Sequence, residues 1–176
     1  MKKVLFVCTG NTCRSPMAMG IFNNMASNIT GSDQPGFGFT AISAGLSAWA
    51  GDPPSANAVL AMQKLFKIDI TAHRARLLSH SDMEEAFLVL GMTMSHKQYI
   101  LQQFPEACDK VFSLKEYAYG TAADIQTDIQ NKDPGTISKQ QLDIPDPYGG
   151  SLQHYIACAR EIEQAVAALV EKLKKI

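Results

Sequence analysis

Residues 8–16 read CTGNTCRSP, directly after the apolar run 4–7 and before a segment with helical spacing. Residues 3–8 are rich in β-branched and aromatic side chains and are followed by Thr-Gly-Asn, which is typical of a buried parallel strand. Pro16 and the apolar residues that follow it predict a helix with Ser15 as its cap. The predicted order is therefore strand, glycine-containing loop, helix.

Strand and helix patterns alternate along the rest of the chain. Strands are predicted at 39–43, 86–92 and 110–114, and helices at 56–66, 95–104 and from residue 151 onward. This alternation favours an α/β fold with a parallel sheet covered by helices, as a single domain over residues 1–176. Such sheets bind ligands at the carboxyl ends of their strands, where the quoted loop lies. The polar segment 118–141 is predicted to be a mobile loop.

Composition limits the classes of partner. The net charge is -1, from 16 basic and 17 acidic residues, and neither sign forms a block, so no nucleic-acid partner is expected. No run approaches the roughly 18 apolar residues of a membrane span, so no membrane partner is expected. The four cysteines (Cys8, Cys13, Cys108 and Cys158) are too scattered for a disulfide framework, which favours the cytoplasm.

The quoted loop has the composition of a phosphate site. Backbone N–H groups of a glycine-containing loop at a helix N-terminus converge on an anion, and the helix dipole adds positive charge there. The planar fork of donors on Arg14 matches phosphate oxygens in pairs. The same donors stabilise a thiolate at Cys8, to which Ser15 can donate a hydrogen bond. We therefore expect Cys8 to be a nucleophile that attacks phosphorus.

A phosphoryl transfer to cysteine also needs an acid, first for the leaving group and then to activate water. Asp-Pro pairs begin at Asp52, Asp133 and Asp146. Only Asp146 is followed by an aromatic residue and a helix-opening turn, DPYGGS, in which Tyr148 can line the pocket. We predict that Asp146 is the acid. No Cys/His pair has the ligand spacing that would complete a metal site with the two loop cysteines, so no metal is expected.

With these motifs assembled, the sequence resembles the low-molecular-weight protein-tyrosine phosphatase family, and most of all its bacterial protein-arginine phosphatase branch. The resemblance rests on CTGNTCRSPMA, MTMSHKQ, VFSLKEY and DPYGG, and covers most of the chain outside 118–141. It implies a three-layer, flavodoxin-like fold with a four-stranded parallel sheet, a phosphocysteine intermediate and no cofactor. Phosphorylated proteins are the implied substrates, and phosphate and other oxyanions the implied inhibitors.

The resemblance also assigns roles to individual residues. Asp146 is implied to act as acid and then as base. Ser43 and His73 match family positions that hold Asn11 in a strained turn, although His73 also reads as an exposed residue at a helix end. Phosphate binding is implied for the loop residues Thr9, Gly10, Asn11, Thr12, Cys13, Arg14 and Ser15.

Which phosphoamino acid is attacked depends on the pocket walls. Thr12 and Thr93 stand where phosphotyrosine-directed members usually carry a bulky aliphatic residue and an Asp. A Thr12 hydroxyl can pair with a guanidinium N–H and the Asp146 carboxylate attracts that cation, whereas a phenyl ring gains nothing from either. Phosphoarginine is therefore the expected substrate. Trp49 matches an aromatic that packs on the substrate ring in phosphotyrosine-directed members, so phosphotyrosine is the alternative, with Thr12, Trp49 and Tyr148 as specificity residues.

Two other functions use the same type of loop. Arsenate reductases of this fold relay a disulfide through further cysteines near the third strand, but residues 74–107 contain none. A non-catalytic phosphate-binding module would need neither the thiol of Cys8 nor the carboxylate of Asp146. A disulfide between Cys8 and Cys13 under oxidising conditions stays open.

Overall fold

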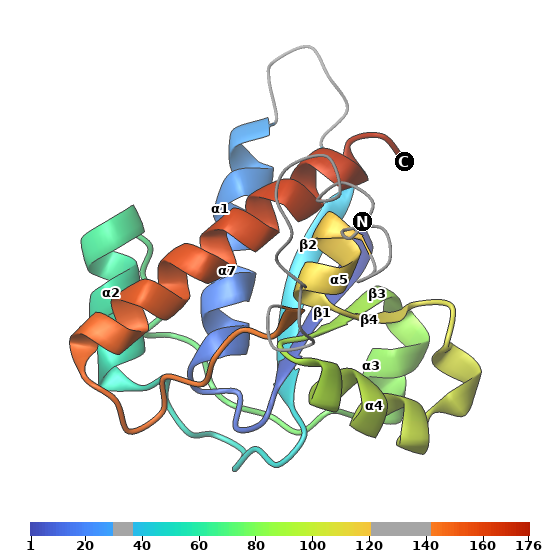
Figure 1. Ribbon diagram of the computed structural model, residues 1–176, viewed down its shortest axis with the longest axis horizontal. Helices are drawn as coiled ribbons and strands as arrows, with labels where there is room; N and C mark the ends of the chain where they lie inside the picture. Colours follow the sequence, from blue (N-terminus) through green and yellow to red (C-terminus); the bar gives the residue numbers. More distant parts are fainter. Residues whose placement is uncertain (30–36, 121–141) are drawn as a thin grey trace, which may run out of the picture.

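The computed structural model describes residues 1–29, 37–120 and 142–176 (Figure 1). Four parallel strands form one sheet in the order β2-β1-β3-β4. The strands are β1 (Lys2–Cys8), β2 (Phe39–Gly45), β3 (Ala86–Gly91) and β4 (Val111–Ser113). The predicted α/β class and four-stranded parallel sheet are confirmed.

Helices cover both faces of this sheet, because alternate side chains of the central strand β1 are buried on opposite sides. Val4, Phe6 and Cys8 belong to the core beneath α1 and α7, and Leu5 and Val7 belong to the core beneath α3 and α4. Figure 1 shows α7 crossing α1 on the first of these faces. The helices are α1 (Arg14–Ile29), α2 (Ala56–Phe66), α3 (His80–Glu85), α4 (Met94–Gln103), the 3₁₀ helix η1 (Pro105–Ala107), α5 (Leu114–Tyr119) and α7 (Leu152–Leu173).

The strand order places the loop after β1 at a switch point of the sheet. Strand β1 lies between β2 and β3, and the register pairs its last residue, Cys8, with Gly45 at the end of β2. The loops after β1 and β3 leave the same edge of the sheet in opposite directions, and sheets of this kind bind ligands at such a point. The predicted location of the quoted loop at the carboxyl edge is confirmed.

Parts of the predicted secondary structure differ from the structure. Helix α1 begins at Arg14, so Ser15 lies inside its first turn and is not the cap. Helix α3 was not predicted. Helix α5 takes in Ala118 and Tyr119, where the mobile loop was predicted to begin; of that predicted loop, residues 121–141 lie outside the described residues. Within the described residues, no helix is both long enough and apolar enough to cross a membrane.

Candidate active site

Cys8 lies at the carboxyl end of β1, in front of the N-terminus of α1. Its side chain is buried, and its Sγ is 3.0 Å from Ser15 Oγ and 3.3 Å from the backbone N of Asn11, which donates to it. Both neighbours stabilise negative charge on sulfur, as does the positive end of the helix dipole. The contact between Cys8 and Ser15 agrees with the prediction.

The carbonyls of the loop are bound by groups around its outside. Leu46 N donates to the carbonyl of residue 8 and Ser47 N to that of residue 9, at 3.0 and 2.9 Å, which extends the contact between β1 and β2 beyond both strands. Ser55 N donates to the carbonyl of residue 12 at 2.9 Å. Because C=O and N–H point in opposite directions in a trans peptide, outward carbonyls direct the following N–H groups inward. The loop is therefore a concave set of amide donors, which suits an anion.

Asn11 gives the loop a backbone conformation that most residues avoid. Its φ of 56° lies in the left-handed region, which costs least for glycine and asparagine. Its Nδ2 donates to Ser15 Oγ at 2.9 Å and to Ser43 Oγ at 3.0 Å, and its Oδ1 accepts from Arg76 N at 3.0 Å. His73 Nε2 lies 2.8 Å from the Asn11 carbonyl, which can only accept, so this ring nitrogen carries the proton. Burial lowers the pKa of His73 and favours that neutral form.

Thus Ser43 and His73 both contact Asn11, as the resemblance implies, whereas the role of Arg76 was not predicted. The backbone N of Arg76 is held in place from its side chain, which donates twice to the Asp82 carboxylate at 2.7 and 2.8 Å. Asp82 also accepts from Ser79 N in the capping box of α3. The short helix therefore fixes the segment that supports Asn11.

Arg14 forms one wall of the site and is almost fully buried, at 4% exposure. Its Nη1 donates to the carbonyl of Ile144 at 3.2 Å, and its Nη2 donates to Asp146 Oδ2 at 2.7 Å. Its Nε is buried and has no hydrogen-bond partner among the described residues. A buried N–H donor without an acceptor costs free energy. An anion bound in the loop would supply that acceptor.

Asp146 reaches Arg14 because the segment before it is attached to the sheet. Ile144 is fully buried, and its N donates to the carbonyl of Met92 at 2.8 Å, while Asp143 Oδ1 accepts from Met94 N at 2.7 Å. Asp146 Oδ1 accepts from Tyr148 N at 3.2 Å, which orients the carboxylate. The side chain of Asp146 is 46% exposed, so water can reach it.

His96 is a residue of the site that sequence reasoning missed. It is 8% exposed in the first turn of α4, and its Nε2 is 3.0 Å from Thr9 Oγ1 in the loop. Burial and the nearby Arg14 guanidinium lower the pKa of His96 to about 4. The ring is therefore neutral at pH 7. His96 lies in the segment MTMSHKQ, where Thr93 accepts from His96 N at 3.1 Å as the cap of α4, but nothing in that segment indicates the contact with Thr9.

Cys13 contacts polar groups at the base of the site. Its Sγ is 2.9 Å from Ser55 Oγ and 3.3 Å from the hydroxyl of Tyr155, neither of which was predicted. Burial and the contact with Cys13 raise the pKa of Tyr155 to about 12. Burial also raises the pKa of Cys158 to about 12, so that thiol is not a nucleophile. Among the described residues, no three His, Cys, Asp or Glu side chains gather as metal ligands.

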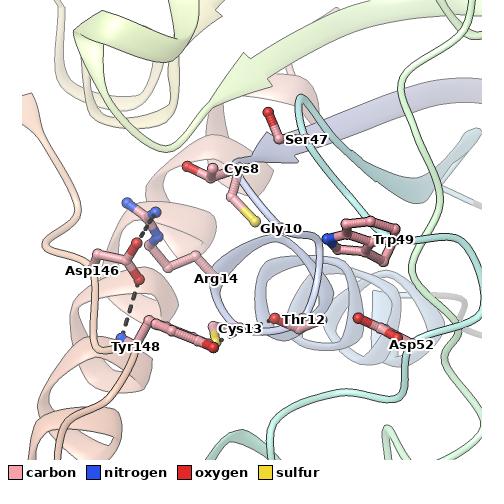
Figure 2. A pocket seen from close by; sticks show the side chains of 11 residues that line it. Cys8, Gly10, Thr12, Cys13, Arg14, Ser47, Trp49, Asp52, Asp146 and Tyr148 are labelled. Atoms are coloured by element: carbon pink, nitrogen blue, oxygen red, sulfur yellow. Dashed lines mark hydrogen bonds and ion pairs between the residues drawn. The ribbon is translucent and has the colours of Figure 1, made fainter.

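These residues surround one pocket of about 240 Å³ (Figure 2). In Figure 2, Cys8, Gly10 and Thr12 lie between the side chains of Asp146 and Tyr148 on one side and those of Trp49 and Asp52 on the other. Trp49 and Tyr148 are strongly exposed at its mouth, at 80% and 76%. Ser47 and Asp52 also line the pocket and were not predicted. The full lining is Cys8, Thr9, Gly10, Thr12, Cys13, Arg14, Ser47, Trp49, Asp52, Asp146 and Tyr148.

The family described as "Low molecular weight phosphotyrosine protein phosphatase" matches residues 3–176. A protein-arginine-phosphatase of Bacillus subtilis (strain 168) is 37% identical over 173 residues, which cover 98% of this chain and 97% of the relative. A crystal structure of a low molecular weight protein tyrosine phosphatase from T. tengcongensis is 39% identical, with a TM-score of 0.78 over 98% of this chain and 99% of that chain.

A YwlE arginine phosphatase mutant with a phosphorylated active-site serine is 36% identical, with a TM-score of 0.79, and the match covers 98% of this chain and 96% of that chain. These matches extend over nearly the whole sequence. The chain therefore belongs to the low-molecular-weight phosphotyrosine protein phosphatase family.

Proposed function

We propose that this protein removes phosphoryl groups from phosphorylated arginine residues of proteins, with Cys8 as the nucleophile. The observation that carries the proposal is the position of Cys8 Sγ in the loop, 3.3 Å from Asn11 N and 3.0 Å from Ser15 Oγ. The free Nε of Arg14 and the inward amides supply donors for the phosphoryl oxygens. A thiolate at the centre of such a set is directed at phosphorus.

In the first step the Cys8 thiolate attacks phosphorus and the P–N bond to the arginine breaks. The electron pair of that bond goes to the leaving nitrogen, which takes a proton from the Asp146 carboxylic acid. Binding of the phosphoryl dianion engages Arg14, which is the partner of the Asp146 carboxylate when no substrate is bound. The products of this step are phosphocysteine, free arginine side chain and the Asp146 carboxylate.

In the second step water attacks the phosphocysteine, and Asp146 takes the proton that the water loses. The P–S bond breaks, phosphate leaves, and sulfur returns to the thiolate. Asn11 and Ser15 contact the sulfur directly and stabilise the charge that it regains. The 46% exposure of the Asp146 side chain supports this role, because the attacking water must reach it.

Thr12 supports phosphoarginine as the substrate. Its side chain extends from the loop and lines the pocket. A hydroxyl there can accept from a guanidinium N–H, while a phenyl ring offers no donor to it. The relatives named as protein-arginine phosphatases match nearly the whole of this chain, which supports the same substrate.

The test is the ratio of kcat/KM for a phosphoarginine peptide to that for the matched phosphotyrosine peptide. We expect the unchanged protein to favour phosphoarginine, and Thr12→Val to lower the ratio about ten-fold, as expected when a hydrogen bond to a charged group is lost. Thr12→Ser is the matched control, which keeps the hydroxyl and should keep the ratio. A protein that favours phosphotyrosine, with a ratio unaffected by Thr12→Val, would contradict the proposal.

Phosphotyrosine is the second candidate because of the aromatic residues at the mouth. Trp49 and Tyr148 are both strongly exposed and line the pocket, and such rings can stack on a phosphotyrosine ring. A relative named as a probable low molecular weight protein-tyrosine-phosphatase is 31% identical to the chain over its full length. Trp49→Ala lowers activity on both substrates if the indole only shields the pocket, and on phosphotyrosine alone if it selects the ring.

We also propose that the protein works in the cytoplasm. All four cysteines are free thiols, with Cys108 exposed and the other three buried. Free thiols, one of them required for the reaction, are suited to a reducing compartment.

A further inference from the structure

Trp49 and Asp52 are the two ends of a rigid turn at the mouth of the pocket. Asp52 N donates to the Trp49 carbonyl at 3.2 Å, and Gly51 between them has a φ of 94°. Gly51 N donates to the carbonyl of Ala75, and Ala75 N donates to the carbonyl of Asp52, both at 2.8 Å. All of these bonds use backbone atoms, so the turn is held without help from the Asp52 carboxylate.

That carboxylate faces the pocket. Asp52 lines it together with Thr12 and Trp49, and in Figure 2 its side chain extends toward Thr12, on the far side of the pocket from Asp146. Within residues 1–29, 37–120 and 142–176 the side chain of Asp52 makes no ion pair and no hydrogen bond. Arg14 is the one basic residue in the pocket lining, and its Nη2 is already paired with Asp146.

A negative charge at the mouth of a phosphate site opposes binding of the dianion, unless the substrate brings a positive group to the same place. The exposed indole of Trp49, three residues earlier in the same turn, offers a face on which a cation can also rest. The two side chains together suit a positively charged group close to the phosphoryl group.

We infer that Asp52 is a specificity-determining residue whose carboxylate binds a cationic side-chain group of the protein substrate. This inference rests on the proposed function for the phosphoryl site and adds the class of substrate that the mouth accepts. The cation is either the guanidinium of the phosphorylated arginine or a basic residue next to it in the substrate. An exposed ion pair between a carboxylate and a substrate cation changes kcat/KM by about three- to five-fold and is weakened by salt.

Asp52→Asn tests this inference, with Asp109→Asn as the matched control. The control changes the net charge equally at an exposed residue before β4, at the opposite edge of the sheet. Three substrates are compared by kcat/KM: p-nitrophenyl phosphate, a phosphoarginine peptide with neutral neighbours, and the same peptide with lysine neighbours. Each is measured at low salt and at high salt.

We expect Asp52→Asn to leave p-nitrophenyl phosphate hydrolysis unchanged or slightly faster, and to lower kcat/KM on the peptides about three- to five-fold at low salt only. An equal loss on both peptides assigns the cation to the phosphorylated arginine. A loss confined to the lysine peptide assigns it to a neighbour. Equal effects of Asp52→Asn and Asp109→Asn, or an unchanged preference among the three substrates, would overturn the inference.

The peptide pair is also made with phosphotyrosine, which separates this inference from the choice of substrate. If the unchanged protein hydrolyses phosphotyrosine and not phosphoarginine, the proposed substrate fails. The effect of lysine neighbours and its dependence on Asp52 then still decide whether the carboxylate binds a cation.

Discussion

Arg14 and Asp146 form an ion pair on one side of the pocket, at 2.7 Å. Arg14 is buried and fixed also by the carbonyl of Ile144, whereas the carboxylate is half exposed. In the proposed reaction an incoming phosphoryl group competes for the arginine, which is the fixed partner. The contact between Arg14 and Asp146 would then be replaced during the reaction.

Asp146→Asn should slow the reaction most for substrates with poor leaving groups, because the amide cannot deliver a proton. A positioned acid contributes about 10²- to 10⁴-fold, so kcat/KM for a phosphoarginine or phenyl phosphate substrate should fall within that range. The loss of kcat/KM should be much smaller for dinitrophenyl phosphate, whose leaving group needs no proton. The measurement is kcat/KM across a series of aryl phosphates, which reports the first step alone, beside the Asp109→Asn control. A uniform loss across the series would remove Asp146 from the role of acid.

At this scale the sequence was most informative for residues inside one motif. In the structure Cys8, Arg14 and Asp146 line one pocket. Ser43 and His73 both contact Asn11. The structure also shows that His96 and Arg76 contact the loop, which no motif indicated. Their contacts join α4 and the segment before α3 to the loop, and such pairings depend on the tertiary packing of separate elements. The catalytic roles themselves stay predictions.

Among the elements, the loop after β1 depends on how closely β2 approaches it. A Cβ at Gly45 would lie 2.6 Å from the carbonyl of Thr9, 2.9 Å from Ala48 Cβ and 3.0 Å from Asn11 Cβ. At Gly10, the glycine inside the motif, the nearest atom to an added Cβ would be Thr12 Oγ1 at 3.6 Å. The steric requirement for glycine therefore lies on the neighbouring strand and not in the loop.

Gly45→Ala should destabilise the protein by about 1 to 3 kcal/mol, as overpacking does, because backbone must shift at the Thr9 carbonyl. It should also lower kcat by displacing the loop. Gly10→Ala is the matched control, which should leave the free energy of unfolding within about 0.5 kcal/mol of its original value. Urea unfolding and kcat are measured for both variants. A Gly45→Ala protein as stable and active as Gly10→Ala would show that this approach is not needed.

Long helices were predicted well and short helices were not. The periodicity of residues 56–66 gave the bounds of α2. Helices α3 and α5 have six residues each, too few for a hydrophobic period to appear. Each nevertheless begins with a capping box, Ser79 with Asp82 and Ser113 with Glu116, and these pairs were the signals that the sequence contained.

At the scale of the whole molecule, the buried side chain of His96 makes the free energy of unfolding depend on pH. His96 belongs to α4, and its ring contacts Thr9 in the loop after β1. The pKa of His96 is about 4 in the folded protein, whereas that of an unperturbed histidine is 6.5. As pH falls below 6.5 the unfolded chain binds a proton that the folded protein refuses until about pH 4, so stability present above pH 6.5 is lost in this window. Burial lowers the pKa of His73 too, which acts in the same direction.

The free energy of unfolding should therefore fall by about 3 kcal/mol through His96 between pH 6.5 and pH 4. His96→Gln removes the titrating ring but can still reach Thr9, so its unfolding free energy should vary less over that interval. Urea unfolding at half-unit steps of pH gives both curves. Parallel curves for the two proteins would contradict the assignment of a buried, neutral imidazole.

The central claim is that the phosphoryl group passes through the sulfur of Cys8, and trapping that intermediate tests it most directly. Asp146→Asn with dinitrophenyl phosphate should form phosphocysteine quickly and hydrolyse it slowly, so that acid quenching in the first turnover captures it. Trypsin releases residues 4–14, which contain Cys8 and Cys13, and fragmentation in a mass spectrometer distinguishes the two thiols. We predict the mass of one phosphoryl group on Cys8, unchanged in Cys13→Ser. A phosphoryl group on Cys13, or turnover at the normal rate in Cys8→Ala, would contradict the account.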